Sequence, residues 1–384
     1  MRTIRFLQPQ RLVFGSGCVA ECSRDLVERQ FRKAFLVTSP PTKSLADELI
    51  AQLAAAGAET VVYDAIAGEP TIASFEASLK AAAAVNPDVV IGLGGGSALD
   101  VSKLVAALLH GSQNIREVFG IGLLKSRATH LVCLPTTSGT GSEVSPNAIL
   151  LDEDDELKKG VVSPFLVPDG TYVDPMLTMS MPPGVTAATG IDALTHCIEA
   201  YTNKFAHPMV DIYAIEGVRL AGAFLARAVK DGNDLEAREK MALASVYGGL
   251  CLGPVNTAAV HALSYPLGGE FHIAHGLSNA VLLPHVMRFN IPSMPQRYAD
   301  VAVALGVQPS HTVEKTAMMG AGRVYELAVE CGITMDLAKL GVPATSIPKM
   351  AEAAIKVTRL LKNNPRDLTI HDAEAIYRSA YQTA

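Results

Sequence analysis

The stretch DVVIGLGGGSALDVSKLVAALL (88–109) decides the fold. Its first six residues are almost entirely apolar, which is typical of a short buried strand, and its last twelve have the apolar spacing of a helix. Three glycines and a serine separate these two segments: Gly94, Gly95, Gly96 and Ser97. A strand that turns directly into a helix predicts a β-α unit, with the turn at the carboxyl end of the strand.

The same alternation runs through the first half of the chain. Short apolar runs predict buried strands at 34–38, 60–64, 88–93 and 130–135. Ala-rich stretches between them predict helices at 45–57 and 74–85. Strands and helices at this spacing predict a parallel, Rossmann-like sheet with helices on its faces. The acidic run Asp152–Glu156, between NAILL and KKGVV, predicts the solvated tip of a hairpin.

The second half of the chain has a different pattern. Helical periodicity without strand-like alternation predicts helices at 209–229, 235–250 and 346–361. Pro182-Pro183 marks a natural boundary between the two patterns. The sequence therefore predicts two domains, an α/β domain at 1–182 and an all-α domain at 183–384.

Composition excludes several classes of protein. Apolar residues make up 49% and charged residues 18%, so the chain is not a disordered polymer. The 32 Lys and Arg against 38 Asp and Glu argue against nucleic acid or a membrane surface as a partner. The longest uncharged run, 246–269, contains two prolines and a histidine and is a poor membrane span. Six cysteines without a CxxC pair, and no visible signal peptide, predict a protein of the reducing cytoplasm.

Two loops are candidates for binding a phosphate-containing ligand. The turn Gly94–Ser97 opens a helix, where exposed backbone N–H groups and the helix dipole favour an anion. The second loop, PTTSGTGS (135–142), also follows a predicted strand, and its hydroxyls and amides suit a pyrophosphate and a ribose. A simple tight turn explains the first loop about equally well, and a polar surface loop is the alternative for the second.

The helical half contains a candidate metal site. Asp192 and His196 are four residues apart on a predicted helix and therefore share one face. His261, His272 and His275 lie within fifteen residues, across a Gly-Gly turn. One carboxylate with two or three imidazoles is a donor set for a divalent ion, Fe²⁺ or Zn²⁺. A hydrogen-bonded Asp–His pair on a helix surface, with histidines packed in a core, is the alternative.

Five separated segments resemble the iron-containing (group III) alcohol dehydrogenase family. They are GGGSALDVSK, LPTTSGTGSE, ATGIDALTHCIEAY, HALSYPLGGEFHIAHG with LSNAVLLPHV, and KNNPRDLT. The resemblance spans nearly the whole chain and implies a dinucleotide-binding α/β domain followed by a helical metal domain. It implies a metal bound by Asp192, His196, His261 and His275, and a pyrophosphate on the glycine turn. Further cofactor contacts are implied for Asp100, Thr136, Thr137, Thr140, Asn147, Lys158 and Leu177.

The chain departs from the family pattern at two places. Many members have an acidic residue after the strand that resembles 36–38, where it would repel a 2′-phosphate, but this chain has Ser39-Pro40-Pro41. The cofactor is therefore expected to be NAD or NADP. Many members also have a proton-relay histidine four residues after the one that matches His261. This chain has Tyr265 there, so His272 is the candidate catalytic residue, with a supporting role beside the ligands as the alternative.

The resemblance implies hydride transfer between a small alcohol or aldehyde and NAD(P). Three other functions stay open: a maleylacetate-reductase-like enzyme that reduces the C=C bond of an acidic substrate, a lyase of the dehydroquinate-synthase type, and a non-catalytic assembly subunit. The segments TIRFL and RLVFG are predicted strands that could pair across a two-fold axis, so a homo-oligomer is expected.

Overall fold

The computed structural model describes residues 2–154 and 157–381. These residues form two compact units. One unit comprises Phe6–Thr137 and Gly141–Ser180. The other begins at Met181 and also includes Ser138–Thr140 and the first residues of the chain up to Arg5.

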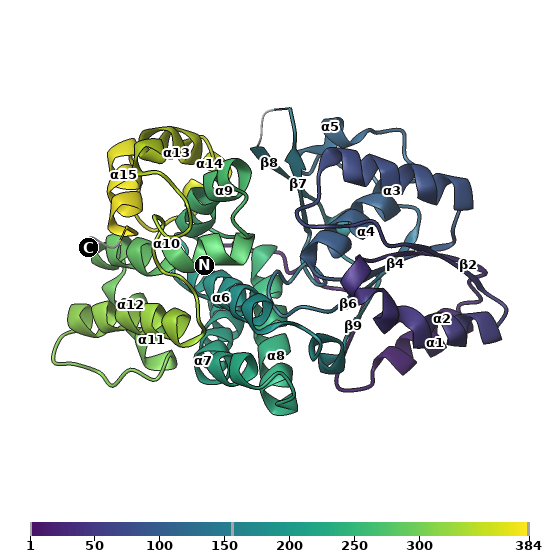
Figure 1. Ribbon diagram of the computed structural model, residues 1–384, viewed down its shortest axis with the longest axis horizontal. Coiled ribbons are helices and arrows are strands. Elements are labelled where there is room, and N and C mark those ends of the chain that lie inside the picture. The colour runs from purple at the N-terminus through teal and green to yellow at the C-terminus, as the bar shows by residue number, and fades with distance from the viewer. Residues whose placement is uncertain (1, 155–156, 382–384) are drawn as a thin grey trace. The chain divides into compact units, whose positions relative to one another are not determined.

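The first unit is built on a parallel sheet of six strands, which confirms the predicted fold class (Figure 1). In spatial order the strands are β1 (Arg11–Phe14), β9 (Gly170–Val173), β6 (His130–Pro135), β4 (Val89–Gly94), β2 (Lys33–Val37) and β3 (Glu59–Tyr63). After β2 the chain adds β3 on one side and then β4 and β6 on the other. The carboxyl ends of β2 and β4 therefore flank the point where the strand order reverses, the usual ligand-binding edge of such a sheet.

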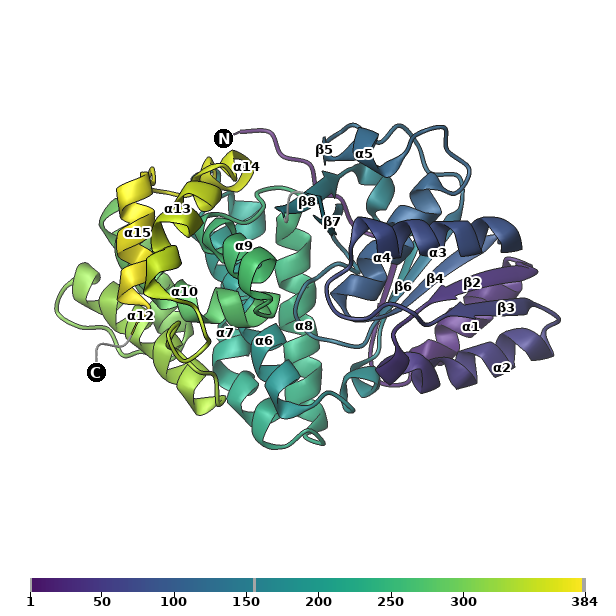
Figure 2. The ribbon, with the colours of Figure 1, turned by 45° about the horizontal axis from the view of Figure 1, so that its top comes forward.

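Helices cover both faces of this sheet because side chains along each strand alternate between two cores (Figure 2). Phe35 and Val90 pack with α3 (Ile72–Val85) and α4 (Gly96–Leu108). Leu36 and Ile91 pack with α1 (Val19–Glu28) and α2 (Asp47–Ala55). Every residue of β4 is buried, which explains its nearly continuous apolar sequence.

A second sheet of three strands belongs to the same unit. Its order is β5 (Gly120–Ile121), β8 (Leu157–Val162) and β7 (Asn147–Asp152), and β7 and β8 form the predicted antiparallel hairpin. The short helix α5 (Ile115–Val118) lies nearby in the sequence. The expectation of a wholly solvated acidic tip is wrong at Asp152, which is buried because Arg116 and Lys159 donate to its carboxylate. Residues 155 and 156 of that run lie outside the described residues.

The second unit is helical throughout the described residues from Met181 on. Its helices are α6 (Pro183–Tyr201), α7 (Pro208–Lys230), α8 (Leu235–Leu252), α9 (Ala259–Phe271), α10 (His275–Asn290), α11 (Pro295–Ala304), α12 (Val313–Glu330), α13 (Ile347–Ile355), α14 (Thr358–Leu361) and α15 (Ile370–Ser379). Its core gathers aliphatic residues from nearly all of them, among them Leu194, Leu263 and Leu282. The single helix predicted at 346–361 is two helices, α13 and α14, separated at Lys356 and Val357. The prediction was wrong here because the apolar spacing continues across the break.

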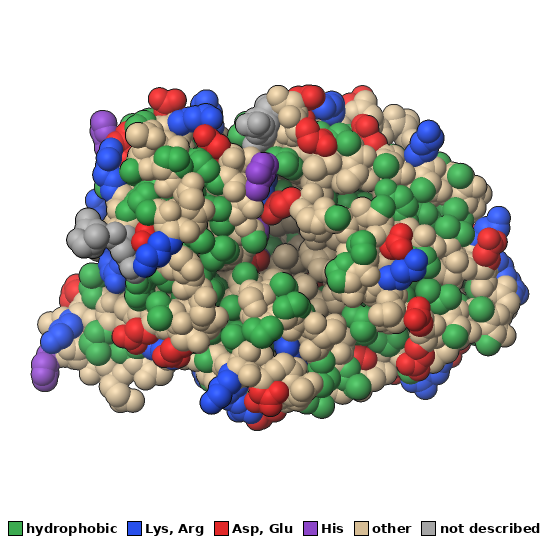
Figure 3. Space-filling model, viewed as in Figure 1, with side chains coloured by type: hydrophobic (Ala, Val, Ile, Leu, Met, Phe, Trp, Pro, Cys, Tyr) green, Lys and Arg blue, Asp and Glu red, His purple; other side chains and the backbone are tan. Residues whose placement is uncertain are grey.

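The N-terminal segment TIRFL is not a strand, in contrast to the prediction, and pairing begins only at Arg11. All six cysteines are free thiols. Among the described residues, no helix is long and apolar enough to cross a membrane. On the face shown in Figure 3, side chains of Lys and Arg alternate with those of Asp and Glu, without a large area of one sign.

Candidate active site

The predicted ligand side chains of the helical unit gather around the Asp192 carboxylate, and three of them, Asp192, His261 and His275, offer ligand atoms that all lie within 4.8 Å of one another. Asp192 and His196 lie one turn apart on α6, His261 lies on α9, and His275 is the first residue of α10. The Asp192 Oδ1 atom is 3.5 Å from His261 Nε2, 3.7 Å from His275 Nε2 and 3.9 Å from His196 Nε2. The Nε2 atoms of His196 and His261 are 3.0 Å apart. These separations bracket the spacing of about 3.4 Å between ligands that each lie about 2.1 Å from a tetrahedral ion.

Hydrogen bonds at Nδ1 orient two of the rings. His196 Nδ1 lies 3.2 Å from the carbonyl oxygen of Gly139, and His261 Nδ1 lies 2.5 Å from Oε2 of Glu199. Carbonyl and carboxylate oxygens only accept, so each Nδ1 carries the hydrogen. Each ring therefore turns Nε2 toward Asp192, and Nε2 is the atom that would bind a metal.

A fifth polar side chain, Asn279, lies in the same cluster. It is four residues after His275 on α10, and its Nδ2 donates to Asp192 Oδ1 at 2.7 Å. The same Nδ2 is 3.2 Å from His261 Nε2 and 3.4 Å from His275 Nε2. Asn279 is fully buried and holds the Asp192 carboxylate in a fixed orientation.

The buried groups of this cluster shift one another's pKa values. Burial alone would raise the pKa of Asp192, but the surrounding imidazoles, that of His196 foremost, hold it well below its ordinary value. Burial alone would lower the pKa of His261, yet the carboxylates of Glu199 and Asp192 raise it to about 9. Burial lowers the pKa of His196. A buried carboxylate among three imidazoles fits a divalent cation in both charge and donor type.

His272, the candidate proton-transfer residue, and Tyr265, at the position of the family's relay histidine, both belong to the α9 region. Tyr265 follows His261 by one turn, and its hydroxyl accepts a hydrogen bond from Arg359 at 3.4 Å. His272 caps the C-terminus of α9 in a left-handed conformation (φ +54°) and is exposed. It lies in the chain between two predicted ligands, three residues before His275.

The glycine turn lies at the carboxyl end of β4, in the α/β unit. Gly94 ends the strand, Gly95 is the N-cap of α4, and Gly96 and Ser97 form its first turn. A Cβ atom at Gly95 would lie 3.3 Å from the Thr137 methyl group, so a side chain here would narrow the turn. Glycine keeps the backbone N–H groups of the helix start open to an anion.

The second predicted loop is divided between the two units. Thr136 donates its N–H to the carbonyl of Gly94 at 2.9 Å, which joins the loop to the glycine turn. The buried Oγ1 of Thr136 has no hydrogen-bond partner among the described residues, as expected of a group that awaits a ligand. Thr140 belongs with Ser138 and Gly139 to the helical unit, where the Gly139 carbonyl accepts from His196.

The remaining predicted cofactor residues lie on several elements of the α/β unit. Asp100, on α4, accepts from Ser142 Oγ at 2.5 Å and from the Ile149 N–H at 2.8 Å. Asn147 starts β7, and its buried Oδ1 has no hydrogen-bond partner among the described residues. Lys158, farther along the hairpin, pairs with Glu69 at 2.8 Å. The side chain of Leu177 is buried in the core of the α/β unit.

The structure adds residues that the sequence interpretation missed. Lys103 is fully buried and donates to Ser142, to the Ser145 carbonyl at 2.9 Å and to the Asn147 carbonyl, so it ties α4 to the loop before β7. Glu199 and Asn279 were also missed. Helical spacing offered a signal for both, since Glu199 follows Asp192 by seven residues and Asn279 follows His275 by four.

Two family models match the chain. The iron-containing alcohol dehydrogenase model matches residues 9–175, and the C-terminal model of the Fe-containing alcohol dehydrogenase family matches residues 186–381. The long-chain-alcohol dehydrogenase 1 of Geobacillus thermodenitrificans (strain NG80-2) is 40% identical over 362 residues, which cover 92% of this chain and 91% of that protein.

Solved structures agree with this assignment. A 1,3-propanediol oxidoreductase superposes with a TM-score of 0.95 at 32% identity, covering 99% of this chain and 100% of the other. The sulfoacetaldehyde reductase of Bifidobacterium kashiwanohense, solved with NAD⁺, superposes with a TM-score of 0.88 at 28% identity over all of both chains. The resemblance seen in five sequence segments is thereby confirmed. The chain belongs to the iron-containing alcohol dehydrogenase family of oxidoreductases.

Proposed function

We propose that the protein is a metal-dependent alcohol dehydrogenase that transfers hydride between a small alcohol and NAD or NADP, and reduces the aldehyde or ketone in the reverse direction. The observation that carries the proposal is the gathering of His196, His261 and His275 around the Asp192 carboxylate, with their Nε2 atoms 3.5 to 3.9 Å from its Oδ1. Three of these residues, Asp192, His261 and His275, offer ligand atoms that all lie within 4.8 Å of one another.

The proposed metal ligands are these four side chains, with Fe²⁺ or Zn²⁺ as the ion. The proposed cofactor residues are the glycine turn, with Asp100, Thr136, Thr137, Thr140, Asn147, Lys158 and Leu177. When bound, the divalent ion supplies stabilisation of negative charge on a substrate oxygen, and the nicotinamide supplies a hydride acceptor or donor.

The chain's own side chains prepare the site for this chemistry. The Gly139 carbonyl and the Glu199 carboxylate fix the rings of His196 and His261, so little reorganisation is needed. Asp192, His196 and His261 are at most 5% exposed, which keeps bulk water from competing for the ligand atoms. His272 is proposed to exchange the alcohol proton with solvent, because it is exposed and close in the chain to His275.

A substrate panel with both cofactors tests the proposal. The purified protein is assayed with small alcohols, diols and aldehydes by the near-ultraviolet absorbance of the reduced nicotinamide. It is assayed as isolated, after chelation, and after reloading with Fe²⁺ or Zn²⁺. Activity that disappears with the metal and returns with it is expected. Full activity in metal-free protein would contradict the proposal.

An acidic substrate is the second candidate. The Arg359 guanidinium donates to Tyr265, one turn of α9 from His261, and so brings a positive charge near the proposed site. Carboxylated and sulfonated aldehydes, and maleylacetate, therefore belong in the same panel. Reduction of maleylacetate that survives chelation would favour a C=C reductase over an alcohol dehydrogenase.

A homo-oligomer is proposed from the edge of the large sheet. The outer side of β1 has no strand partner among the described residues, and Leu12 and Phe14 on this strand are about 40% exposed. An apolar edge strand of this kind favours pairing with a second copy. Sedimentation equilibrium measures the oligomeric state, and a monomer at micromolar concentration would contradict the proposal.

The cytoplasm is the proposed location. Six free thiols, five of them buried, suit a compartment in which cysteines stay reduced. Cell fractionation with a cytoplasmic marker enzyme tests this, and recovery in an extracellular fraction would contradict it.

A further inference from the structure

A carboxylate outside the predicted ligand set contacts His261 at Nδ1, the ring nitrogen that does not face the other ligands. Glu199 lies on α6, two turns after Asp192, and is 4% exposed. Its Oε2 accepts from His261 Nδ1 at 2.5 Å, and its Oε1 accepts from the backbone N–H of Val260 at 2.7 Å. One side chain therefore fixes both the ring of His261 and the backbone of the residue before it.

The two ligand rings held through Nδ1 differ in their partners. The partner of His196 is a neutral carbonyl, whereas the partner of His261 is an anion. A carboxylate behind a ligating imidazole fixes the ring orientation and makes Nε2 a stronger donor to a metal. His261 is thus the ligand whose affinity for a metal depends on a second side chain.

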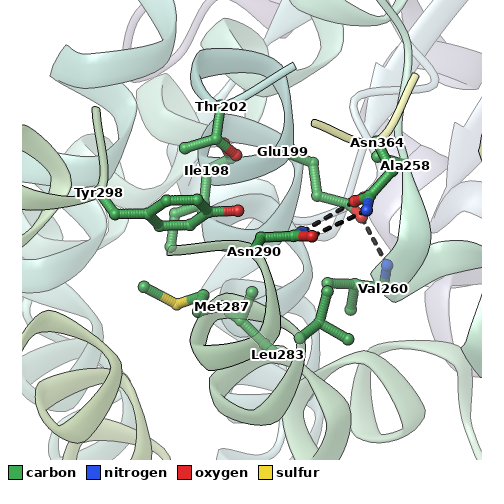
Figure 4. A pocket seen from close by; sticks show the side chains of 11 residues that line it. Ile198, Glu199, Thr202, Ala258, Val260, Leu283, Met287, Asn290, Tyr298 and Asn364 are labelled. Carbon is green, nitrogen blue, oxygen red and sulfur yellow. Dashed lines mark hydrogen bonds between the residues drawn. The ribbon is translucent and has the colours of Figure 1, made fainter. Parts of the chain in front are cut away.

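Glu199 also lines a small cavity that has both apolar and polar walls (Figure 4). The cavity of about 10 Å³ has room for about one water molecule. Thr202, Tyr298, Asn290 and Asn364 line it, and the two asparagines exchange amide hydrogen bonds of 2.8 Å. These four lining groups are neutral, and the imidazole of His261 is the basic group that the Glu199 carboxylate contacts directly.

We propose that Glu199 is a positioning residue that holds His261 in the Nδ1–H tautomer and thereby sets the affinity of the site for a divalent metal. The proposal rests on the proposed function, since it assumes that His261 is a ligand. The competing explanation is purely structural. Glu199 accepts from a backbone N–H at the start of α9, where the N-cap residue, Ala258, makes no side-chain hydrogen bond.

Three variants separate the two roles. Glu199→Gln keeps an oxygen for the Val260 N–H but removes the charge that faces His261. Glu199→Ala removes both contacts. Thr202→Val is the matched control, because Thr202 lines the same cavity and its hydroxyl donates to the Ile198 carbonyl at 2.8 Å, not to a ligand.

The measurement is Co²⁺ binding to the metal-free full-length protein, by competition with a chelator, together with the visible absorption of the bound Co²⁺. Glu199→Gln is expected to bind Co²⁺ about 10- to 100-fold more weakly, with a changed visible spectrum and an unchanged melting temperature of the metal-free protein. Thr202→Val is expected to match wild type. Equal Co²⁺ affinity and spectrum in wild type and Glu199→Gln would overturn the proposal and leave only the helix cap.

A second measurement needs no variant at Glu199. In Zn²⁺-loaded wild type labelled with ¹⁵N-histidine, the His261 ring is expected to show a protonated Nδ1, and its assignment comes from the signal that His261→Gln lacks. A His261 ring protonated at Nε2 would overturn the proposal. Wild type that binds Co²⁺ tightly but turns over no alcohol would refute the proposed function alone, whereas wild type that binds no divalent metal would refute both.

Discussion

The glycine turn after β4 is suited to an anion and the ligand cluster of α6, α9 and α10 to a cation, and the two sites are built from different parts of the chain. The turn offers backbone N–H groups and an absence of side chains, so its chemistry depends on four consecutive residues, Gly94–Ser97. The cluster offers side chains from three helices that are buried, oriented by further hydrogen bonds and dependent on the whole helical core. A site made of backbone is local in sequence, whereas a site made of buried side chains is a product of tertiary structure.

His261→Ala is expected to have the largest effect and tests whether the two sites are separable. Removing the central imidazole leaves Asp192 and Glu199 buried without their shared partner, so metal is lost and turnover falls by more than about 1000-fold. NAD(P)H affinity, measured by fluorescence titration, is expected to persist because the glycine turn is in the other unit. Loss of cofactor binding in a folded His261→Ala protein would show that the sites depend on each other.

Glu143→Gln is expected to have the next largest effect, on stability. In the helical cluster, imidazoles offset the cost of burying the Asp192 charge and lower its pKa. In the α/β unit, burial raises the pKa of Glu143 from 4.5 to about 7. A raised pKa means that the folded state holds a proton that the unfolded state releases, so stability is lost as the pH rises from 4.5 to 7. The full loss is on the order of 3 kcal/mol above pH 7.

Denaturant unfolding across this pH range measures the difference. Glu143→Gln is expected to be more stable than wild type above pH 7, with the advantage vanishing toward pH 4.5. Glu76→Gln, on the exposed face of α3, is the control and is expected to follow wild type. A constant offset between Glu143→Gln and wild type at every pH would contradict the assigned protonation.

Gly95→Ala, in the α/β unit, is expected to have the opposite pattern to His261→Ala, with cofactor binding weakened and metal binding kept. The added methyl group meets Thr137 at 3.3 Å and narrows the place where a phosphate would approach the N–H groups. NAD(P)H affinity is expected to fall about 10- to 100-fold, the equivalent of one charge-assisted hydrogen bond, while metal content stays at the wild-type level. Gly111→Ala, beyond the other end of α4, makes only ordinary contacts and is the matched control. Unchanged cofactor affinity in Gly95→Ala would place the pyrophosphate elsewhere.

The same contrast explains what could be predicted from the sequence. The strand at 130–135 and the glycine turn were predictable because apolar runs and glycines act locally. The spacing of Asp192 and His196 indicated a shared helix face, but only the family resemblance selected His261 and His275 as their partners. Glu199 shares the helix face of Asp192 by spacing, but its partner could not be predicted, because its role depends on the contact between α6 and α9.

Two predicted elements differ from the structure, each for its own reason. TIRFL has strand-like composition but no strand beside it, so the backbone hydrogen bonds that would make it a strand are missing. The interruption at Lys356 and Val357 keeps the apolar period of the flanking helices, so periodicity alone predicted one helix where there are two.

Ser39→Asp is expected to have the smallest effect, and it tests how far the backbone-built site extends. Ser39 follows β2 at the point where the strand order reverses. Its hydroxyl lies 2.8 Å from that of Thr42, and Thr42 Oγ1 lies 3.7 Å from a Cβ built at Gly94, so Ser39 is close to the glycine turn. A carboxylate here would repel a 2′-phosphate by about 1 kcal/mol at a partly exposed site, so affinity for NADPH is expected to fall several-fold and that for NADH to stay unchanged. Ser39→Asn supplies a side chain of equal size without charge and is expected to leave the NADPH-to-NADH ratio as in wild type. If both variants weaken NADH and NADPH binding equally, position 39 acts through shape and not charge. If Ser39→Asp leaves the affinities for NADH and NADPH unchanged, the adenosine ribose does not lie beside the end of β2.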